Sequence, residues 1–275
     1  IQMTFGHTRF IWNQMLGMLN ERYQNNPNLK MLSYSKLSSL IPQLKREYPW
    51  LKDVDSIAIQ CSVKTLSDTF DRFFKEVCRY PKFKSRKQTV QSYLSTIRGE
   101  SIRFNDNQRY VKLPKLGWVK CRMSVPHIEN ERIKSVTIKQ KPSGKYTISV
   151  LVTSENQTLP KTHQTVGIDL GVSDFVITSD GHKYRSQRLH LKYQKQLHVW
   201  EKRMARRRLR AKAEYKSLSE TKNYQKARQQ VARIHEKIAH TRKDYIHKIT
   251  TDLVKNYDVI VIEDLKTSNL LKIIT

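Results

Sequence analysis

Two acidic residues that end short apolar segments are the strongest candidates for catalysis in this sequence. Asp169 follows residues 166–168, and Glu263 follows residues 259–262. Apolar, β-branched runs that stop at an acid are typical of buried parallel strands, which present ligand-binding side chains at their carboxyl ends. Carboxylate oxygens are the ligands that Mg²⁺ prefers, and paired metal ions can hydrolyse phosphodiesters. The two segments therefore predict a divalent-metal site at one edge of a parallel sheet.

A simpler interpretation of these acids competes with the metal site. Asp and Glu are common where strands end and where the first turn of a helix begins, so both acids could be structural. The composition favours the metal site, because 52 Lys and Arg against 24 Asp and Glu give a formal charge of +28 and a pI near 10.1. Such an excess attracts polyanions, and nucleic acid is the leading partner. A site for phosphodiester chemistry then explains both acids together.

Composition also limits the compartment and the partners. The cations are spread over the whole chain, and no apolar stretch reaches the roughly 20 residues of a membrane-spanning helix, so no membrane partner is expected. Cys61, Cys78 and Cys121 are odd in number and widely spaced, which fits reduced thiols in the cytoplasm. The sequence has no Cys-x-x-Cys pair, so a structural zinc site within it is not expected.

Hydrophobic periodicity changes twice along the chain. Residues 1–80 have helical spacing and predict a small bundle, with helices at 4–23, 35–48 and 55–80. We expect their aromatic residues to form a core, and a base-stacking role is the alternative. Residues 81–153 have a period of two and predict a sheet or partly open barrel, a shape that often binds oligonucleotides. The expected strands are 101–104, 110–113, 118–122, 133–139 and 146–152.

The last part of the sequence explains how the two acids could meet. Strands are expected at 166–169, 175–178 and 183–184, with a hairpin turn at 179–181. Two long helical runs within residues 187–257 then lead to a strand at 259–262. A helical crossover of this kind returns the chain to the same sheet, parallel to the first strand. We therefore expect Asp169 to lie beside Glu263.

Two basic segments are candidates for nucleic-acid binding. Residues 80–87 and 91–93 interleave aromatic rings with cations, a combination that stacks on unpaired bases and neutralises phosphates, although a surface linker is the alternative. Residues 202–212 contain seven cations and no acid, where a solvated helix face would carry both signs. The candidate contact residues are Lys82, Lys84, Arg86, Lys87, Tyr93, Arg206, Arg207, Arg208 and Arg210.

The motifs around both acids resemble those of a known family. Residues 167–172 resemble the first RuvC motif, and residues 261–265 the second, of the TnpB proteins of insertion-sequence transposons, which are relatives of the type V CRISPR effectors. The resemblance covers nearly the whole chain, and the motifs are specific in combination. The family's wedge region is similar to residues 80–85, 91–93 and 144–146 of this sequence. Its first recognition helix is similar to residues 4–10 and 12–13.

This resemblance implies an α+β, multidomain architecture. It implies a helical recognition domain at 1–80, an OB-like wedge β-barrel at 81–160, and an RNase H-like RuvC domain at 161–275 that has a long helical insertion and is incomplete at its C-terminus. The implied function is RNA-guided DNA binding with two-metal cleavage, so the partners are a guide RNA and target double-stranded DNA, and the cofactor is Mg²⁺. Asp169 would bridge two ions and Glu263 would hold one of them, whereas Asp264 points away if the strand pleat continues.

The sequence departs from the family pattern in parts that the family needs. The third catalytic Asp, the four-cysteine zinc insertion and an opening strand are missing, so zinc is expected only in a C-terminal part outside this sequence. One expectation is therefore a piece of a longer nuclease, located in the prokaryotic cytoplasm with the nucleoid. The alternative is a nuclease-inactive RNA-guided transcriptional repressor, as in the TnpB-derived repressors called TldR. A third possibility is an accessory nucleic-acid-binding protein whose acids are structural.

Overall fold

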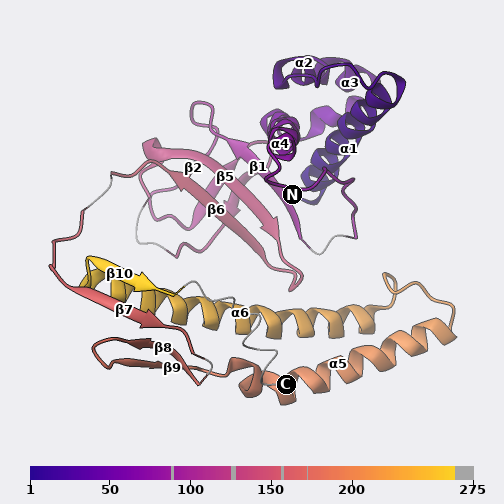
Figure 1. Ribbon diagram of the computed structural model, residues 1–275. Helices are drawn as coiled ribbons and strands as arrows, with labels where there is room; N and C mark the ends of the chain where they lie inside the picture. Colours follow the sequence, from indigo (N-terminus) through magenta and orange to yellow (C-terminus); the bar gives the residue numbers. More distant parts are fainter. Residues whose placement is uncertain (88–89, 125–127, 156–157, 172, 264–275) are drawn as a thin grey trace. The chain divides into compact units, whose positions relative to one another are not determined.

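The computed structural model describes residues 1–87, 90–124, 128–155, 158–171 and 173–263 of the chain (Figure 1). It divides into two compact units, Ile1–Glu155 and Asn156–Thr275, and each is described by itself. Both units combine helices with sheets, in agreement with the predicted α+β class. None of the helices in these ranges has the length and apolar character needed to cross a membrane.

The first unit begins with helices that pack around one apolar core. They are α1 (Gln2–Asn25), α2 (Tyr34–Ser39), α3 (Ile41–Glu47), the 3₁₀ helix η1 (Pro49–Asp53) and α4 (Ser56–Phe74). The core joins one face of α1 to one face of α4, as the helical spacing predicted, through Ile11, Met15, Leu16, Ile59, Val63 and Leu66. The helix expected at 35–48 is broken at Leu40, just before Pro42, and α4 ends six residues before the predicted boundary.

The strands of the first unit form two small antiparallel sheets. One has the order β1 (Gln91–Thr96), β5 (Ile133–Gln140), β6 (Tyr146–Val152), and the other β2 (Arg103–Phe104), β3 (Tyr110–Leu113), β4 (Gly117–Lys120); a short 3₁₀ helix, η2 (Asn130–Arg132), precedes β5. Both sheets contribute to a single core that also takes Phe5 from α1 and Ala58 from α4. Within the described residues the strands do not close into the expected barrel, because β1 and β6 remain edges of their sheet.

Strand β1 was not predicted, and its inward face explains why. Tyr93 and Ser95 alternate into the core, with only 6% and 1% of their surface exposed. Ser95 is polar, so the apolar alternation that marks a half-buried strand is missing. Its hydroxyl donates a hydrogen bond of 2.5 Å to a carboxylate oxygen of Asp55, which satisfies the buried group.

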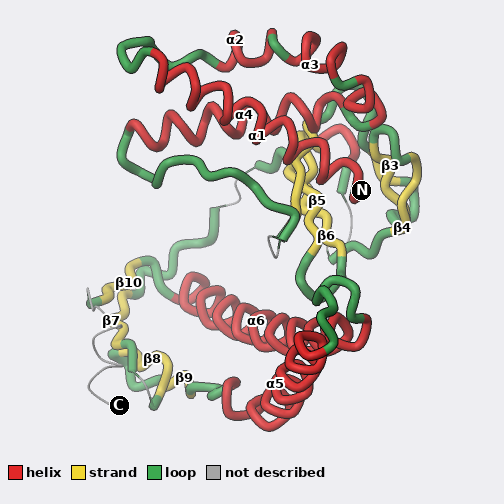
Figure 2. Tube along the Cα trace, turned by 90° about the vertical axis from the view of Figure 1, so that its right-hand side faces the viewer, coloured by secondary structure: helices red, strands yellow, loops and turns green. Residues whose placement is uncertain are grey.

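The second unit is a four-stranded sheet with a helical hairpin. The sheet has the order β10 (Val259–Ile262), β7 (Thr165–Asp169), β8 (Asp174–Thr178), β9 (Lys183–Arg185). Helices α5 (Leu189–Ala213) and α6 (Lys222–Asn256) run beside each other in the hairpin (Figure 2). Ile249 and Leu253 near the end of α6 pack on the sheet against Val166, Ile168 and Val176. Except for small shifts at their ends, these elements match the sequence predictions.

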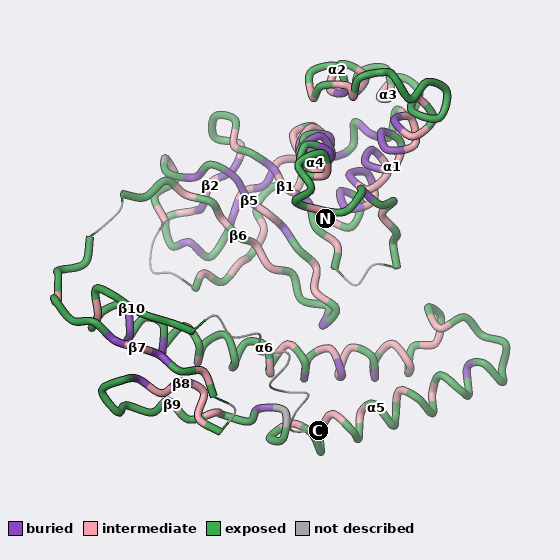
Figure 3. The backbone as a smooth tube through the Cα atoms, viewed as in Figure 1, coloured by how far each residue is buried: buried purple, intermediate pink, exposed green. Residues whose placement is uncertain are grey.

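Strand β10 differs from its prediction in burial. Its apolar run indicated a buried strand, but Val259, Val261 and Ile262 are exposed by 51%, 58% and 58%. The reason is its position, since β10 has only β7 as a neighbour among the described residues and only Ile260 packs against the core. Figure 3 shows the contrast between the exposed β10 and the buried positions of β7.

Candidate metal site and nucleic-acid interface

The pairing of β7 with β10 brings the two candidate acids to the same end of the sheet. The strands are parallel, and the last pairs in register are Val261 with Gly167 and Ile262 with Ile168. Asp169 and Glu263 are the next residues of the two strands. Because neighbouring strands lie about 4.8 Å apart, the two acids are adjacent at the carboxyl edge. The predicted parallel return of the chain is therefore confirmed.

Both carboxylates are exposed and available for a ligand. Within the described residues, neither Asp169 nor Glu263 forms a hydrogen bond or an ion pair with a side chain. The strand pleat explains the exposure of Asp169, because its neighbour Ile168 points into the core. The described part of the chain contains no group of three or more His, Cys, Asp or Glu side chains that could hold a metal. Asp264 lies outside the described residues.

Asp258 fixes the relative position of the two strands, although no sequence motif marked it as a candidate. Its carboxylate accepts hydrogen bonds from the backbone N–H of Thr162 and of His163, at 3.0 and 2.8 Å, and from the Thr162 hydroxyl at 3.1 Å. These bonds lower the pKa of Asp258. Its own N–H donates to the carbonyl of Gln164 at 2.9 Å. The start of β10 is thereby tied to the start of β7, which sets the register at the acids.

A second network ties the end of α6 to the β8–β9 hairpin. Asp180, in the predicted turn, accepts hydrogen bonds from the hydroxyls of Thr178 and Tyr257, and these bonds lower its pKa to about 2. Tyr184 donates a hydrogen bond to Asp252 of α6. Polar contacts therefore hold the helix on the sheet beside the apolar ones.

Gly171 shapes the turn that follows Asp169. A Cβ atom at this position would lie 2.7 Å from the carbonyl oxygen of Asp174. Real Cβ atoms do not approach an oxygen so closely, so any side chain would push the turn apart. Since Asp169 is two residues away, the glycine helps to position the candidate metal ligand.

The basic segment at residues 80–87 is anchored on α1. The indole N–H of Trp12 donates to the Lys82 carbonyl at 3.0 Å, and Asn13 exchanges two hydrogen bonds with the backbone of Lys84. The side chains of Lys82, Arg86 and Lys87 are exposed, as a phosphate contact requires, whereas Lys84 turns inward. Its Nζ lies 3.5 Å from the centre of the Trp12 ring.

Tyr93 has a different position from the other candidate contact residues. Its ring packs edge-on against Phe5 with centroids 5.7 Å apart, in the core of the sheet. Burial is the main cause that raises its pKa. This position fits a core role, so Tyr93 is left out of the interface proposed below.

An exposed aromatic patch lies at the end of α4, where a core was favoured over a base-stacking role. Phe70 is 3% exposed and belongs to the core, but Phe74, one turn later, is 62% exposed. The Phe73 ring lies 5.4 Å from Phe74 and 5.2 Å from Tyr80, and we call Phe73, Phe74 and Tyr80 the aromatic patch. The exposed cations Arg72, Lys75, Arg79 and Lys82 are close to it in sequence. The early end of α4 creates this surface.

The four candidate arginines of α5 do not have the same environment. Arg206 and Arg208 are exposed, and within the described residues they have no ion-pair partner. Arg210 is paired with Glu214 at 2.8 Å. Arg207 is half-buried and donates to the carbonyl of Asn223 at the start of α6, at 2.8 Å. Arg207 therefore connects α5 to α6, while the exposed side chains of Arg206 and Arg208 could contact a polyanion.

Comparison with known proteins agrees with the motifs. Residues 147–274 match a family described as "Probable transposase", and residues 1–27 match one described as "Helix-turn-helix domain". A protein of Escherichia coli strain K12 named "Putative RNA-guided DNA endonuclease InsQ" is 32% identical over 270 residues, which are 97% of this chain and 62% of that protein. A "Putative RNA-guided DNA endonuclease" of Streptomyces pristinaespiralis is 30% identical over 277 residues, 99% of this chain and 64% of that protein.

The chain thus spans a little under two thirds of the length of each relative. The transposase match contains both acids and the strands that carry them, and the second match covers α1. Motifs, strand pairing and relatives agree along nearly the whole sequence. The resemblance to the TnpB family of transposon-encoded proteins is thereby confirmed.

Proposed function

We propose that this chain is part of an RNA-guided DNA endonuclease, with a guide RNA and target double-stranded DNA as its partners. The observation that carries the proposal is the parallel register of β7 and β10, which places Asp169 and Glu263 side by side. Two relatives named for this activity support it. Guide pairing would select the target, and the protein would contact mainly the nucleic-acid backbones.

The exposed pair of carboxylates fits Mg²⁺, a hard cation that prefers oxygen ligands and is often held by one or two carboxylates together with substrate phosphates. Asp169 and Glu263 would hold the metal, which when bound would activate water and neutralise charge on the phosphodiester. Asp258 and Gly171 would position the metal ligands, because Asp258 fixes the strand pairing and Gly171 fixes the turn after Asp169. A further acid from outside this sequence would complete the site.

The basic surfaces of the two units would bind the nucleic acids. In the first unit, Lys82, Arg86 and Lys87 would neutralise phosphates, while the aromatic patch would stack on unpaired bases. In the second unit, Arg206 and Arg208 would contact phosphates, with Arg210 available if it exchanges Glu214 for the ligand. Each surface combines exposed cations with few nearby acids, which is the arrangement expected for a polyanion partner.

RNA co-purification tests this function first. The chain should be isolated with a protected RNA of defined length, seen on a denaturing gel after nuclease treatment. A longer protein that contains this chain should then cut guide-matched DNA in Mg²⁺, and Asp169→Ala should abolish cutting while guided binding persists. Guided binding without Mg²⁺-dependent cutting by the longer parent would identify the repressor alternative. Absence of bound RNA would contradict both.

A further inference from the structure

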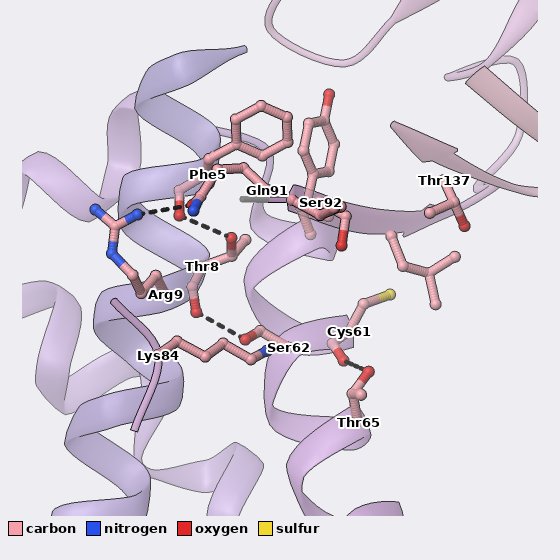
Figure 4. A pocket seen from close by; sticks show the side chains of 14 residues that line it. Phe5, Thr8, Arg9, Cys61, Ser62, Thr65, Lys84, Gln91, Ser92 and Thr137 are labelled. Atoms are coloured by element: carbon pink, nitrogen blue, oxygen red, sulfur yellow. Dashed lines mark hydrogen bonds between the residues drawn. The ribbon is translucent and has the colours of Figure 1, made fainter. Parts of the chain in front are cut away.

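A cavity of about 300 Å³ lies within the first unit, between α1, α4 and β1 (Figure 4). Its volume is at the lower end of the range for small-ligand pockets. The lining includes two cationic side chains, Arg9 from α1 and Lys84 from the segment before β1, and the hydroxyl groups of Thr8 and Ser62. Neither the metal site nor the α5–α6 hairpin uses this cavity.

The Lys84 side chain is held in place at both ends. Its backbone N–H donates to the Asn13 amide oxygen at 2.8 Å, and its carbonyl accepts from the Asn13 amide nitrogen at 2.9 Å. At the other end, its Nζ lies over the Trp12 ring, 3.5 Å from the centre. In Figure 4 the side chain extends toward Ser62 on α4. A lysine fixed in this way is positioned to meet a ligand without losing much further entropy.

The two cations of the cavity have no acidic partner among the described residues. Arg9 donates to the Gln91 side-chain oxygen at 2.9 Å, and burial lowers the pKa of Lys84 to about 8. A partly buried charge without a counter-charge costs free energy, and an anion in the cavity would offset that cost. The hydroxyl protons of Thr8 and Ser62 are already donated to backbone carbonyls, at 2.9 and 2.8 Å. Figure 4 shows the Arg9 guanidinium turned toward Gln91, so Lys84 remains as the main donor for an anion.

We propose that this cavity binds a phosphate group through Lys84. The phosphate would come from a nucleic-acid backbone or from free inorganic phosphate, which offer the same chemistry to the lysine. Only the first source rests on the proposed function. Lys84 would then have a different role from its exposed neighbours Lys82, Arg86 and Lys87, because it meets one phosphate inside the fold.

Side-chain NMR of the chain with ¹³C-labelled lysine tests the site. The Lys84 signal is assigned as the one that Lys84→Arg removes. Its pKa should be near 8 without ligand and should rise toward the ordinary lysine value of 10.5 when a phosphate binds. The rise is expected because a neighbouring anion favours the charged form. The probes are inorganic phosphate and a ten-nucleotide single-stranded RNA, added separately. A shift with RNA alone assigns the nucleic-acid backbone, and a shift with inorganic phosphate assigns the free ion. An unchanged titration with both probes overturns the proposal.

A charge-matched pair of variants provides a second readout. Lys84→Met keeps an unbranched side chain over Trp12 without the charge, and it should weaken RNA binding roughly tenfold, as expected for loss of a charged hydrogen bond. Lys30→Met removes an exposed lysine of the same unit and should change affinity much less. Urea unfolding checks that both variants fold. Equal effects of the two substitutions would contradict the cavity site. If the parent chain binds no RNA, the proposed function fails, and the inorganic phosphate titration still decides the site.

Discussion

Neutralising one carboxylate of the candidate metal site should change stability in opposite directions with and without metal. Asp169 and Glu263 are adjacent residues of paired strands, so their charges lie roughly 5 Å apart. At that distance two exposed charges repel by about 0.8 kcal/mol in water, and salt reduces this further. In a chelator, Asp169→Asn should therefore stabilise the second unit by up to about 0.8 kcal/mol.

In Mg²⁺ the order should reverse. A ligand at ten times its Kd stabilises the folded state by about 1.4 kcal/mol, and the parent gains this while Asp169→Asn gains less. The double variant Asp169→Asn with Glu263→Gln should not respond to the ion at this site. Glu220→Gln is the matched control, because it removes an exposed carboxylate from the α5–α6 connection of the same unit.

Amide hydrogen exchange at Ile168 and Ile262 measures the stability of the paired strands directly. Mn²⁺ should also broaden the NMR signals of residues 166–169 and 260–263 in the parent chain and leave the double variant unchanged. If the parent and the double variant respond equally to both ions, the metal binds elsewhere and the adjacent acids are structural.

Three further predictions concern other features of the two units. Gly171→Ala should cost roughly 1–3 kcal/mol of stability, since the added Cβ meets a backbone oxygen, and amide exchange in β7 and β8 should accelerate; an unchanged rate would show that the turn adapts. The folded pKa of Asp180 is lowered to about 2, so this carboxylate contributes stability that is present above its unfolded pKa near 3.9 and is lost as the pH falls toward 2. Asp180→Asn should therefore make the free energy of unfolding depend less on pH between about 4 and 2. An acid unfolding profile identical to that of the parent would refute the network. Phe74→Ala should weaken binding of unpaired RNA, measured by filter binding, by roughly 1–3 kcal/mol with little loss of stability. Phe70→Ala should instead lower the free energy of unfolding in urea by about 3–5 kcal/mol. The reverse pattern would place Phe74 in the core.

The sheet of the second unit could be predicted because its signals are local and agree with a general rule. The β-branched runs at 166–168 and 259–262 mark strands, and the helical crossover between them makes the strands parallel. Together they place Asp169 beside Glu263 without any long-range information. Asp258 was missed, because an acid before a strand has no distinctive pattern until its partners, Thr162 and His163, are known.

The first unit shows where periodicity is insufficient. Lys84 and Lys82 are two residues apart in one basic segment, yet one side chain turns toward Trp12 and the other toward solvent. Hydrogen bonds from Asn13 and Trp12, on a helix about 70 residues earlier, hold the backbone of this segment, and periodicity does not reveal them. In the same way, the apolar spacing of α4 continues past Phe70, and the end of the helix turns Phe74 from a core residue into a surface one.

The chain carries far more positive than negative charge, and its ion pairs join residues that are close in sequence. Several ion pairs are local, as in Lys64 with Asp68, Arg103 with Glu100 and Lys248 with Asp244, each within four positions in the sequence. These acids are neutralised by near neighbours, and the whole sequence carries a surplus of 28 positive charges. Self-repulsion of this size opposes folding and weakens with salt. Binding of RNA would relieve the same repulsion, so the surfaces proposed to bind nucleic acid and the stability of the fold depend on the same charges.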